Sequence, residues 1–218
     1  MPAGEREALR KLENIAEDAV RLFSNKGKTD AERMVCAAFL RCLGITFRPG
    51  ELVKARSDPP DVLFRDVRFE VMLLLDEDRQ PHKEWKKILE VRRSASSLSE
   101  VLEPIMEPHP LGVDAVAKRV LDGLSAKSSR YDPGTVCSLD ALVYVDLIGR
   151  CLYPSSDSLS APNDLARTWR SICFVFPPYS CVVYATEAAP AFLRQFSGQI
   201  RSECLCDPQL VVDRLFEI

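Results

Sequence analysis

The chain lacks long apolar runs, and this absence bounds where the protein can reside. Its longest apolar runs, such as Val71–Leu75 and Ala141–Val145, are far shorter than the roughly 20 residues that a membrane-spanning helix needs. The N-terminus, which begins Met-Pro-Ala-Gly-Glu-Arg-Glu, has no apolar core of the kind found in signal peptides. We therefore expect a cytoplasmic protein that does not associate with a membrane.

A strong net charge is also missing. The 29 basic and 32 acidic residues leave a net charge of −3, so no field of the whole protein attracts nucleic acid, and such binding needs a local basic patch. The only two histidines are His82 and His109, and the only closely spaced cysteines are Cys204 and Cys206. Because zinc sites need a set of four such ligands at defined spacings, a zinc site is not favoured.

Several familiar sequence signatures are absent. The chain contains no glycine-rich phosphate loop, dinucleotide fingerprint, Gly-x-Ser-x-Gly elbow or Cys-x-x-Cys pair. Their absence argues against nucleotide hydrolases, oxidoreductases and serine hydrolases. The 218 residues, 46% hydrophobic and 28% charged, are typical of a globular chain. We expect a single domain with an N-terminal helix over 1–27, a core over 28–196 and a C-terminal extension over 197–218.

The hydrophobic pattern alternates between helical and strand-like periods, which predicts one α/β domain with a mixed, mostly antiparallel sheet flanked by helices. A two-residue turn at Arg65-Asp66 predicts a hairpin, and Pro177-Pro178 predicts another. The expected helices are 5–25, 29–43, 83–93, 97–103, 112–127 and 188–195, and the expected strands are 45–49, 61–64, 67–75, 139–148, 171–176 and 181–185.

The sharpest chemical feature is a pair of acids, Asp61 and Glu70, on the two strands of the first hairpin. If both point to one face, their carboxylates repel each other unless a cation lies between them. Carboxylate oxygens suit Mg²⁺ or Mn²⁺, and such an ion can activate a water for phosphodiester hydrolysis. The alternative is that Asp61 caps a turn and Glu70 lies on the solvent face of an edge strand.

These residues resemble the PD-(D/E)XK nuclease core, in which a helix carries an acid, one strand carries Pro-Asp and the next carries Glu-x-Lys. Pro60-Asp61, Glu70 and the helical Glu32 fit this order. More narrowly, the chain resembles a family of uncharacterised bacterial proteins (domain of unknown function 1780) that is catalogued as putative endonucleases. The segments that carry this resemblance are Pro59–Val71, Asp76-Glu77, Glu84-Trp85, Arg92–Ala95 and Trp169–Ser171.

The resemblance implies a restriction-endonuclease-like fold and a metal-dependent endonuclease that acts on DNA. Asp61 and Glu70 are then expected to bind Mg²⁺ or Mn²⁺, with Glu32 as a third acidic group. The sequence departs from the nuclease pattern at Met72, which stands where the strand lysine is expected. A thioether cannot orient a water or stabilise negative charge as a lysine does.

A basic residue from a neighbouring helix could replace the missing lysine. The candidates are Lys83, Lys86, Lys87, Arg92 and Arg93, of which Lys83 and Lys87 are the expected catalytic residues. Their segment has a local excess of positive charge and could also contact a phosphate backbone. The alternative function is a catalytically inactive protein that keeps the nuclease fold and acts as a nucleic-acid or protein binding module. An interaction protein that uses an exposed apolar strand edge is a third possibility.

Overall fold

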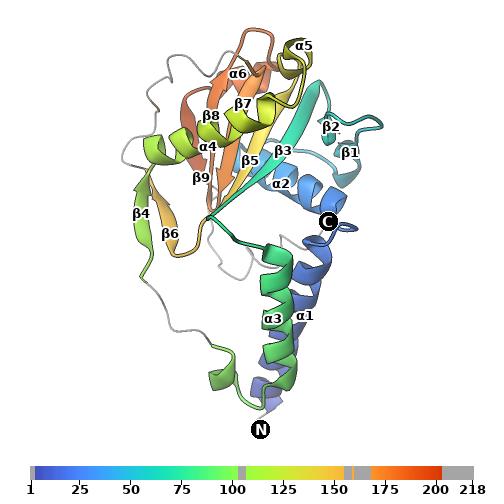
Figure 1. Cartoon of the computed structure of the whole chain (residues 1–218), viewed down its shortest axis with the longest axis vertical. Coiled ribbons are helices and arrows are strands. Elements are labelled where there is room, and N and C mark those ends of the chain that lie inside the picture. Colours follow the sequence, from blue (N-terminus) through green and yellow to red (C-terminus); the bar gives the residue numbers. More distant parts are fainter. Residues whose placement is uncertain (1–2, 103–106, 155–158, 160–167, 203–218) are drawn as a thin grey trace. The chain divides into compact units, whose positions relative to one another are not determined.

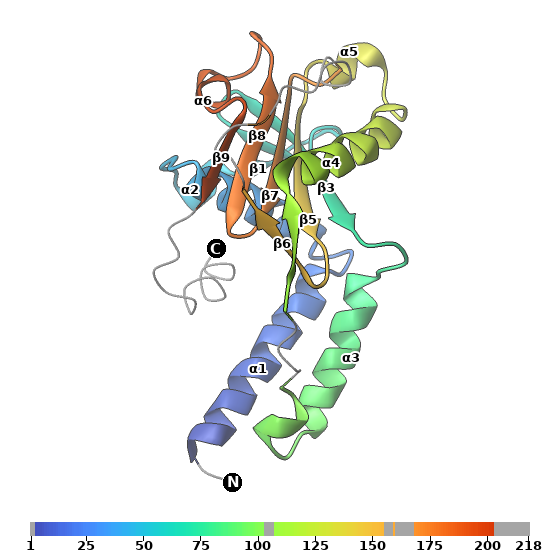
Figure 2. The same cartoon turned by 90° about the vertical axis from the view of Figure 1, so that its left-hand side faces the viewer.

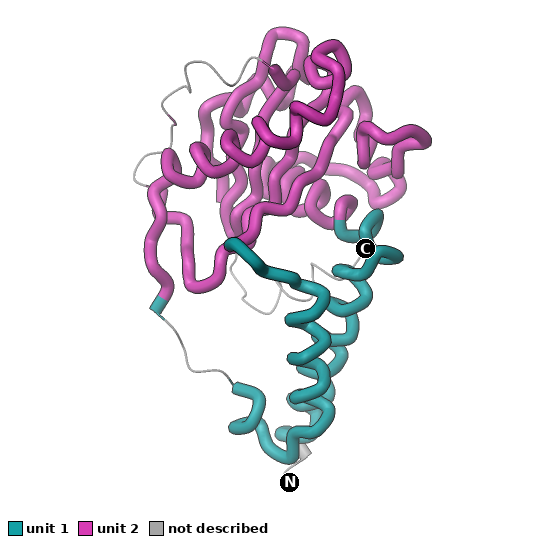
Figure 3. Tube along the Cα trace, in the orientation of Figure 1, with its two compact units in different colours: residues 1–31, 77–107 teal, residues 32–76, 108–218 magenta. Residues whose placement is uncertain are grey.

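The computed structural model describes residues 3–102, 107–154, 159 and 168–202 (Figure 1). It contains two compact units (Figure 3). Unit 1 is made of residues 1–31 and 77–107, and unit 2 of residues 32–76 and 108–218. None of the helices within the described residues is both long and apolar enough to cross a membrane.

Unit 1 is built on a pair of long helices that lie side by side, α1 (Ala3–Leu22) and α3 (Pro81–Ser94) (Figures 1 and 2). The Arg93 guanidinium pairs with Glu13 and Glu17, and Arg92 donates to the Leu12 carbonyl at 2.6 Å. Both helices follow the predicted periodicity. The helix expected over 97–103 is only a short 3-10 turn, η2 (Leu98–Glu100).

Unit 2 is built on a seven-stranded mixed sheet, as predicted, with the order β1-β2-β3-β5-β7-β8-β9. The three central strands β3, β5 and β7 run parallel, and the outer neighbours pair antiparallel. Both predicted hairpins, β2–β3 and β7–β8, are confirmed. The strands are β1 (Val53–Lys54), β2 (Val62–Phe64), β3 (Val67–Leu75), β5 (Asp140–Asp146), β7 (Ser171–Phe176), β8 (Tyr179–Ala185) and β9 (Gln199–Ser202).

Helices cover both faces of this sheet, which explains why β5 is almost entirely apolar. Ala141 and Val143 join the core under α4 (Val113–Ser128), whereas Leu142 joins the core under α2 (Lys28–Cys42). Along β3, Met72 packs on the α4 side and Val71 on the α2 side. The alternation of side chains along a strand therefore places Glu70 on the α4 face.

The N-terminal end of β5 is fixed by a buried carboxylate. Asp140 is fully buried and pairs with the Arg170 guanidinium. It also accepts hydrogen bonds from the Arg68 backbone N–H at 3.0 Å and the Ser171 hydroxyl at 2.7 Å. Asp140 thereby joins β5 to both of its neighbours, β3 and β7.

The smaller elements complete unit 2. A separate parallel pair is formed by β4 (His109–Gly112) and β6 (Arg150–Tyr153). The short helices are η1 (Pro49–Glu51), α5 (Pro133–Val136) and α6 (Ala191–Gln195). The sequence pattern did not predict β1, β4, β6, β9 or α5, all of which are four residues long or shorter.

One predicted strand is wrong. Ile45–Arg48 is irregular and Pro49 begins the 3-10 turn η1. The Ile45 backbone N–H donates back to the Leu40 carbonyl at the end of α2, so this segment terminates the helix. The edge strand of the sheet is instead β1. The Cys204–Cys206 pair and residues 203–218 of the expected C-terminal extension lie outside the described residues.

Candidate metal centre

The β2–β3 hairpin places Asp61 directly across from Glu70. Val62 pairs with Phe69 in the antiparallel ladder, and the Asp61 backbone N–H donates to the Phe69 carbonyl at 2.9 Å. The ladder therefore continues one position beyond β2 to Asp61 and Glu70. An Asp61 carboxylate oxygen also accepts from the Val71 backbone N–H at 2.9 Å, which fixes the orientation of that side chain.

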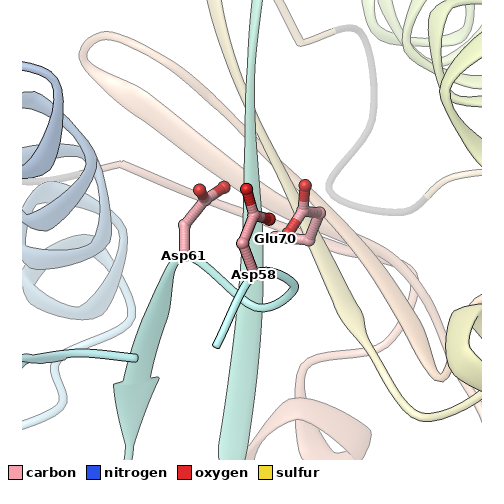
Figure 4. A group of neighbouring side chains, drawn as sticks. All are labelled: Asp58, Asp61 and Glu70. Atoms are coloured by element: carbon pink, nitrogen blue, oxygen red, sulfur yellow. The ribbon is translucent and has the colours of Figure 1, made fainter. Parts of the chain in front are cut away.

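A third acid, Asp58, joins this pair. One carboxylate oxygen from each of Asp58, Asp61 and Glu70 lies within 4.8 Å of the others, and the three side chains point the same way above the hairpin (Figure 4). Asp58 is exposed and Asp61 is partly buried, whereas Glu70 is only 2% exposed. Sequence reasoning missed Asp58, although its spacing in Asp58-Pro-Pro-Asp61 was a signal that could have found it.

Two side chains from the α4 side contact one oxygen of Glu70. The Lys127 ammonium lies 2.7 Å from Glu70 Oε1, and the Tyr131 hydroxyl donates to the same oxygen at 2.8 Å. The other oxygen, Oε2, is buried and has no hydrogen-bond partner among the described residues. A buried carboxylate oxygen without a partner is costly, and a bound cation would satisfy it.

Lys127 belongs to the last turn of α4, and sequence reasoning missed it. Its ammonium also donates to the Val71 carbonyl at 2.7 Å, so it is held between a strand backbone and Glu70, with its side chain 15% exposed. The strand position of the expected lysine is occupied by Met72, which packs towards α4. A Cβ atom added at Gly123 would lie 2.9 Å from the Met72 methyl group, so the glycine leaves room for this thioether.

The local charges favour a divalent cation. The three carboxylates of Asp58, Asp61 and Glu70 lie together, and the Lys127 ammonium pairs with Glu70. Burial first, and then the hydrogen bond and charge of Glu70, raise the pKa of Tyr131, so its hydroxyl remains a donor. The donor set is made of hard carboxylate oxygens, which suit Mg²⁺ or Mn²⁺.

Glu32 lies on α2 and is 8% exposed. It is near the acidic group, because the neighbouring Cys36 is affected by both acids. Burial first, followed by the negative charges of Asp61 and Glu32, raises the pKa of the Cys36 thiol. Burial and these charges therefore favour the protonated thiol. The predicted pair Asp61–Glu70 is thus brought together, with Glu32 on the adjacent helix.

The predicted cations Lys83 and Lys87 lie on α3, in unit 1. Asp58, Asp61, Glu70 and Lys127 all lie in unit 2. Within the described part of the chain, the charged partner of Glu70 is Lys127. Glu70 thus pairs with a lysine of α4 that sequence reasoning did not predict.

Comparisons with known proteins place the chain in a family. Among curated proteins, no relative matches the chain. A solved structure from Pseudomonas aeruginosa strain PAO1, described as a protein of unknown function of the monooxygenase superfamily, is similar with a TM-score of 0.62. The two chains are 29% identical, and the match covers 90% of this chain and 94% of that one. A family model described as "Putative endonuclease, protein of unknown function (DUF1780)" matches residues 4–205, and because this match spans most of the chain, the protein belongs to that family.

Proposed function

We propose that the protein is a metal-dependent endonuclease that hydrolyses phosphodiester bonds in DNA. The observation that carries the proposal is the convergence of Asp58, Asp61 and Glu70 beside the ammonium of Lys127. Acids that hold a hard cation and an adjacent lysine are the parts that phosphodiester hydrolysis requires. The family to which the chain belongs supports a nuclease-like function in a coarser sense.

Asp61 and Glu70 would hold Mg²⁺ or Mn²⁺, with Asp58 completing the acidic set. When bound, the ion would polarise a phosphoryl oxygen and lower the pKa of a coordinated water. Glu70 offers its unpartnered oxygen Oε2, while Lys127 and Tyr131 hold Oε1. Asp61 is fixed by the Val71 N–H. Glu32, on the adjacent helix, would add negative charge to the site from the α2 side.

Lys127 would take the role of the missing strand lysine. An ammonium has three donors, of which one is used by the Val71 carbonyl and one by Glu70 Oε1. The third remains for an attacking water or a phosphoryl oxygen, where it would orient the nucleophile or stabilise developing negative charge. Lys83 and Lys87 would serve as further positive charge for the phosphate backbone.

Met72 favours a second candidate function, a catalytically inactive nuclease fold that binds nucleic acid or protein. Under that hypothesis Lys127 acts only as the counter-ion of a buried glutamate. The similar structure is described as a member of the monooxygenase superfamily, and the donor set described here does not fit the non-haem iron class of such enzymes. Non-haem iron oxygenases use two histidines and a carboxylate, whereas the group described here consists of three carboxylates.

Calorimetric titration with Mn²⁺, combined with cleavage assays on single-stranded and duplex DNA, tests the proposal. The parent should bind Mn²⁺ and cleave DNA, and Asp61→Asn should lose both. Asp66→Asn is the matched control, because Asp66 is an exposed acid on the same hairpin. Mn²⁺ binding without cleavage would favour the inactive fold, and cleavage by Asp61→Asn at the rate of the parent would refute the assignment.

A further inference from the structure

A cavity of about 310 Å³ lies where α4 ends and α5 begins. It is lined by Ser128, Ser129, Tyr131, Pro133, Val136 and Cys137, together with Thr168. This volume is at the lower end of the range for small-molecule sites. None of the metal-centre acids lines it, so it is a separate feature of unit 2.

Tyr131 connects this cavity to the metal centre. Its hydroxyl donates to Glu70 Oε1 at 2.8 Å, and the same residue forms part of the cavity wall. Tyr131 is therefore shared by the acidic group and the cavity, so groups bound at the two sites would be neighbours across this side chain.

The lining is chemically suited to an uncharged group that carries hydrogen-bond donors. The described residues that line the cavity include no acid, lysine or arginine, which disfavours a second phosphate. The Ser128 and Ser129 hydroxyls donate to the Ser125 and Ala126 carbonyls at 2.9 Å each. Their hydrogens are thus engaged, and their lone pairs remain to accept hydrogen bonds from ring N–H or amino groups.

Nucleobases carry such donors on a flat ring and stack on aromatic side chains, which is how single strands are commonly bound. We propose that this cavity binds the nucleobase next to the scissile phosphate, drawn out of the base stack, with Tyr131 as part of its wall. The inference rests on the proposed function and deepens it, since it requires a strand that turns a base towards α5. Tyr131 is then a positioning residue that joins base binding to the orientation of Glu70.

Cys137 provides a reporter, because it lines the cavity and its side chain is exposed. The rate of its alkylation by N-ethylmaleimide, followed by peptide mass spectrometry, measures access to the cavity. The probe is a single-stranded DNA of about 20 nucleotides, added with Ca²⁺ to bind without turnover. An abasic oligomer of the same length is the matched control, because it keeps the phosphate backbone and lacks the bases.

We expect DNA to slow the alkylation of Cys137 about tenfold, the effect of roughly one stacked base. The abasic oligomer should bind and leave the rate unchanged, and Cys151 on β6 should react equally in all samples. The inference is overturned if the two oligomers protect Cys137 equally, if the alkylation of both cysteines slows equally, or if DNA binds without protecting Cys137. If the protein does not bind DNA, both this inference and the proposal that DNA is the substrate are wrong.

A variant that fills the cavity provides an independent readout. Cys137→Trp should weaken DNA binding about tenfold, to the level of the abasic oligomer, and leave the Mn²⁺ affinity as in the parent. The unchanged Mn²⁺ affinity also reports that the variant is folded. Unaltered DNA binding by this variant contradicts the inference. If DNA protects Cys137 selectively but the parent does not cleave DNA in Mg²⁺ or Mn²⁺, the proposed endonuclease activity is refuted and the proposed base-binding site is retained.

Discussion

The Lys127 ammonium lies 2.7 Å from Glu70 Oε1, although the two residues come from elements that are far apart in the sequence, α4 and β3. The strand position two residues after Glu70 is taken by Met72. The positive charge that accompanies the acidic group is therefore supplied across the sheet face and not along the strand. This relationship gives a direct test of whether the site is catalytic.

Lys127→Met should lower the rate of DNA cleavage by about a hundredfold or more, because it removes the ammonium that we propose orients the attacking water or stabilises developing negative charge. It should not weaken Mn²⁺ binding, since it removes a cation that competes for Glu70. Single-turnover cleavage and calorimetry on the same samples measure the two effects. A purely structural lysine would leave the rate of correctly folded protein unchanged.

The control for this variant is Lys118→Met, because Lys118 is an exposed lysine on the same helix. It should cleave as the parent does. The double variant Lys83→Met/Lys87→Met tests the other predicted cations. We expect it to weaken DNA binding, more at low salt than at high salt, and to leave the rate on bound DNA near that of the parent. A loss equal to that of Lys127→Met would assign catalysis to α3.

Mn²⁺ should stabilise the folded protein. A metal that binds only the folded state, at about 100 times its Kd, adds about 2.7 kcal/mol to the free energy of unfolding. Glu70→Gln should lose this increment, because it removes a charge from the buried oxygens that would hold the ion. Thermal unfolding with and without Mn²⁺ measures the effect, with Asp66→Asn as the control. An increment that persists in Glu70→Gln would place the metal elsewhere.

Tyr131 should lower the stability of the metal-free protein at high pH. Burial and the hydrogen bond to Glu70 raise the pKa of Tyr131 above its ordinary value of about 10. Above about pH 10 the unfolded chain loses a proton that the folded chain retains, so the free energy of unfolding falls as the pH rises. The contribution of the protonated Tyr131 side chain to the free energy of unfolding is therefore fully present below about pH 10 and is lost at higher pH.

Tyr131→Phe should remove this component. Urea unfolding on both sides of pH 10, with a chelator present, compares the variant with the parent. Phenolate absorbance should also lose a late-titrating group in the variant. Tyr153→Phe is the control, because Tyr153 is an exposed tyrosine on β6. A parent and Tyr131→Phe that lose stability equally above pH 10 would contradict the prediction.

Asp140→Ala should be strongly destabilising, by about 3–5 kcal/mol, because it leaves the partly buried Arg170 without its partner. It also removes the acceptor of the Arg68 and Ser171 hydrogen bonds. Chemical unfolding measures the loss. Glu7→Gln, which breaks the exposed pair with Arg10 on α1, should change little by comparison. Equal effects of the two variants would show that Asp140 does not fix the end of β5.

Short-range patterns were enough to predict the hairpin and its acids. The turn Arg65-Asp66 leaves only one register for β2 and β3, and a register fixes which side chains lie across from one another. Glu70 within an apolar strand was itself a signal, because a buried carboxylate needs a partner. The amphipathic pattern likewise predicted α2, α3 and α4 closely. The pattern failed at Ile45–Arg48, where a hydrogen bond back to Leu40 replaces a strand partner.

The sequence by itself therefore determined the mixed α/β class, the β2–β3 hairpin and the pairing of Asp61 with Glu70, because these depend on neighbours a few residues apart. Only the tertiary structure decided that Lys127 and Tyr131 meet Glu70. The apolar stripe of α4 shows that the helix is buried on one side, but not which strand lies beneath its last turn. That choice depends on packing between β3 and the long connection to β5, a long-range contact that periodicity does not encode.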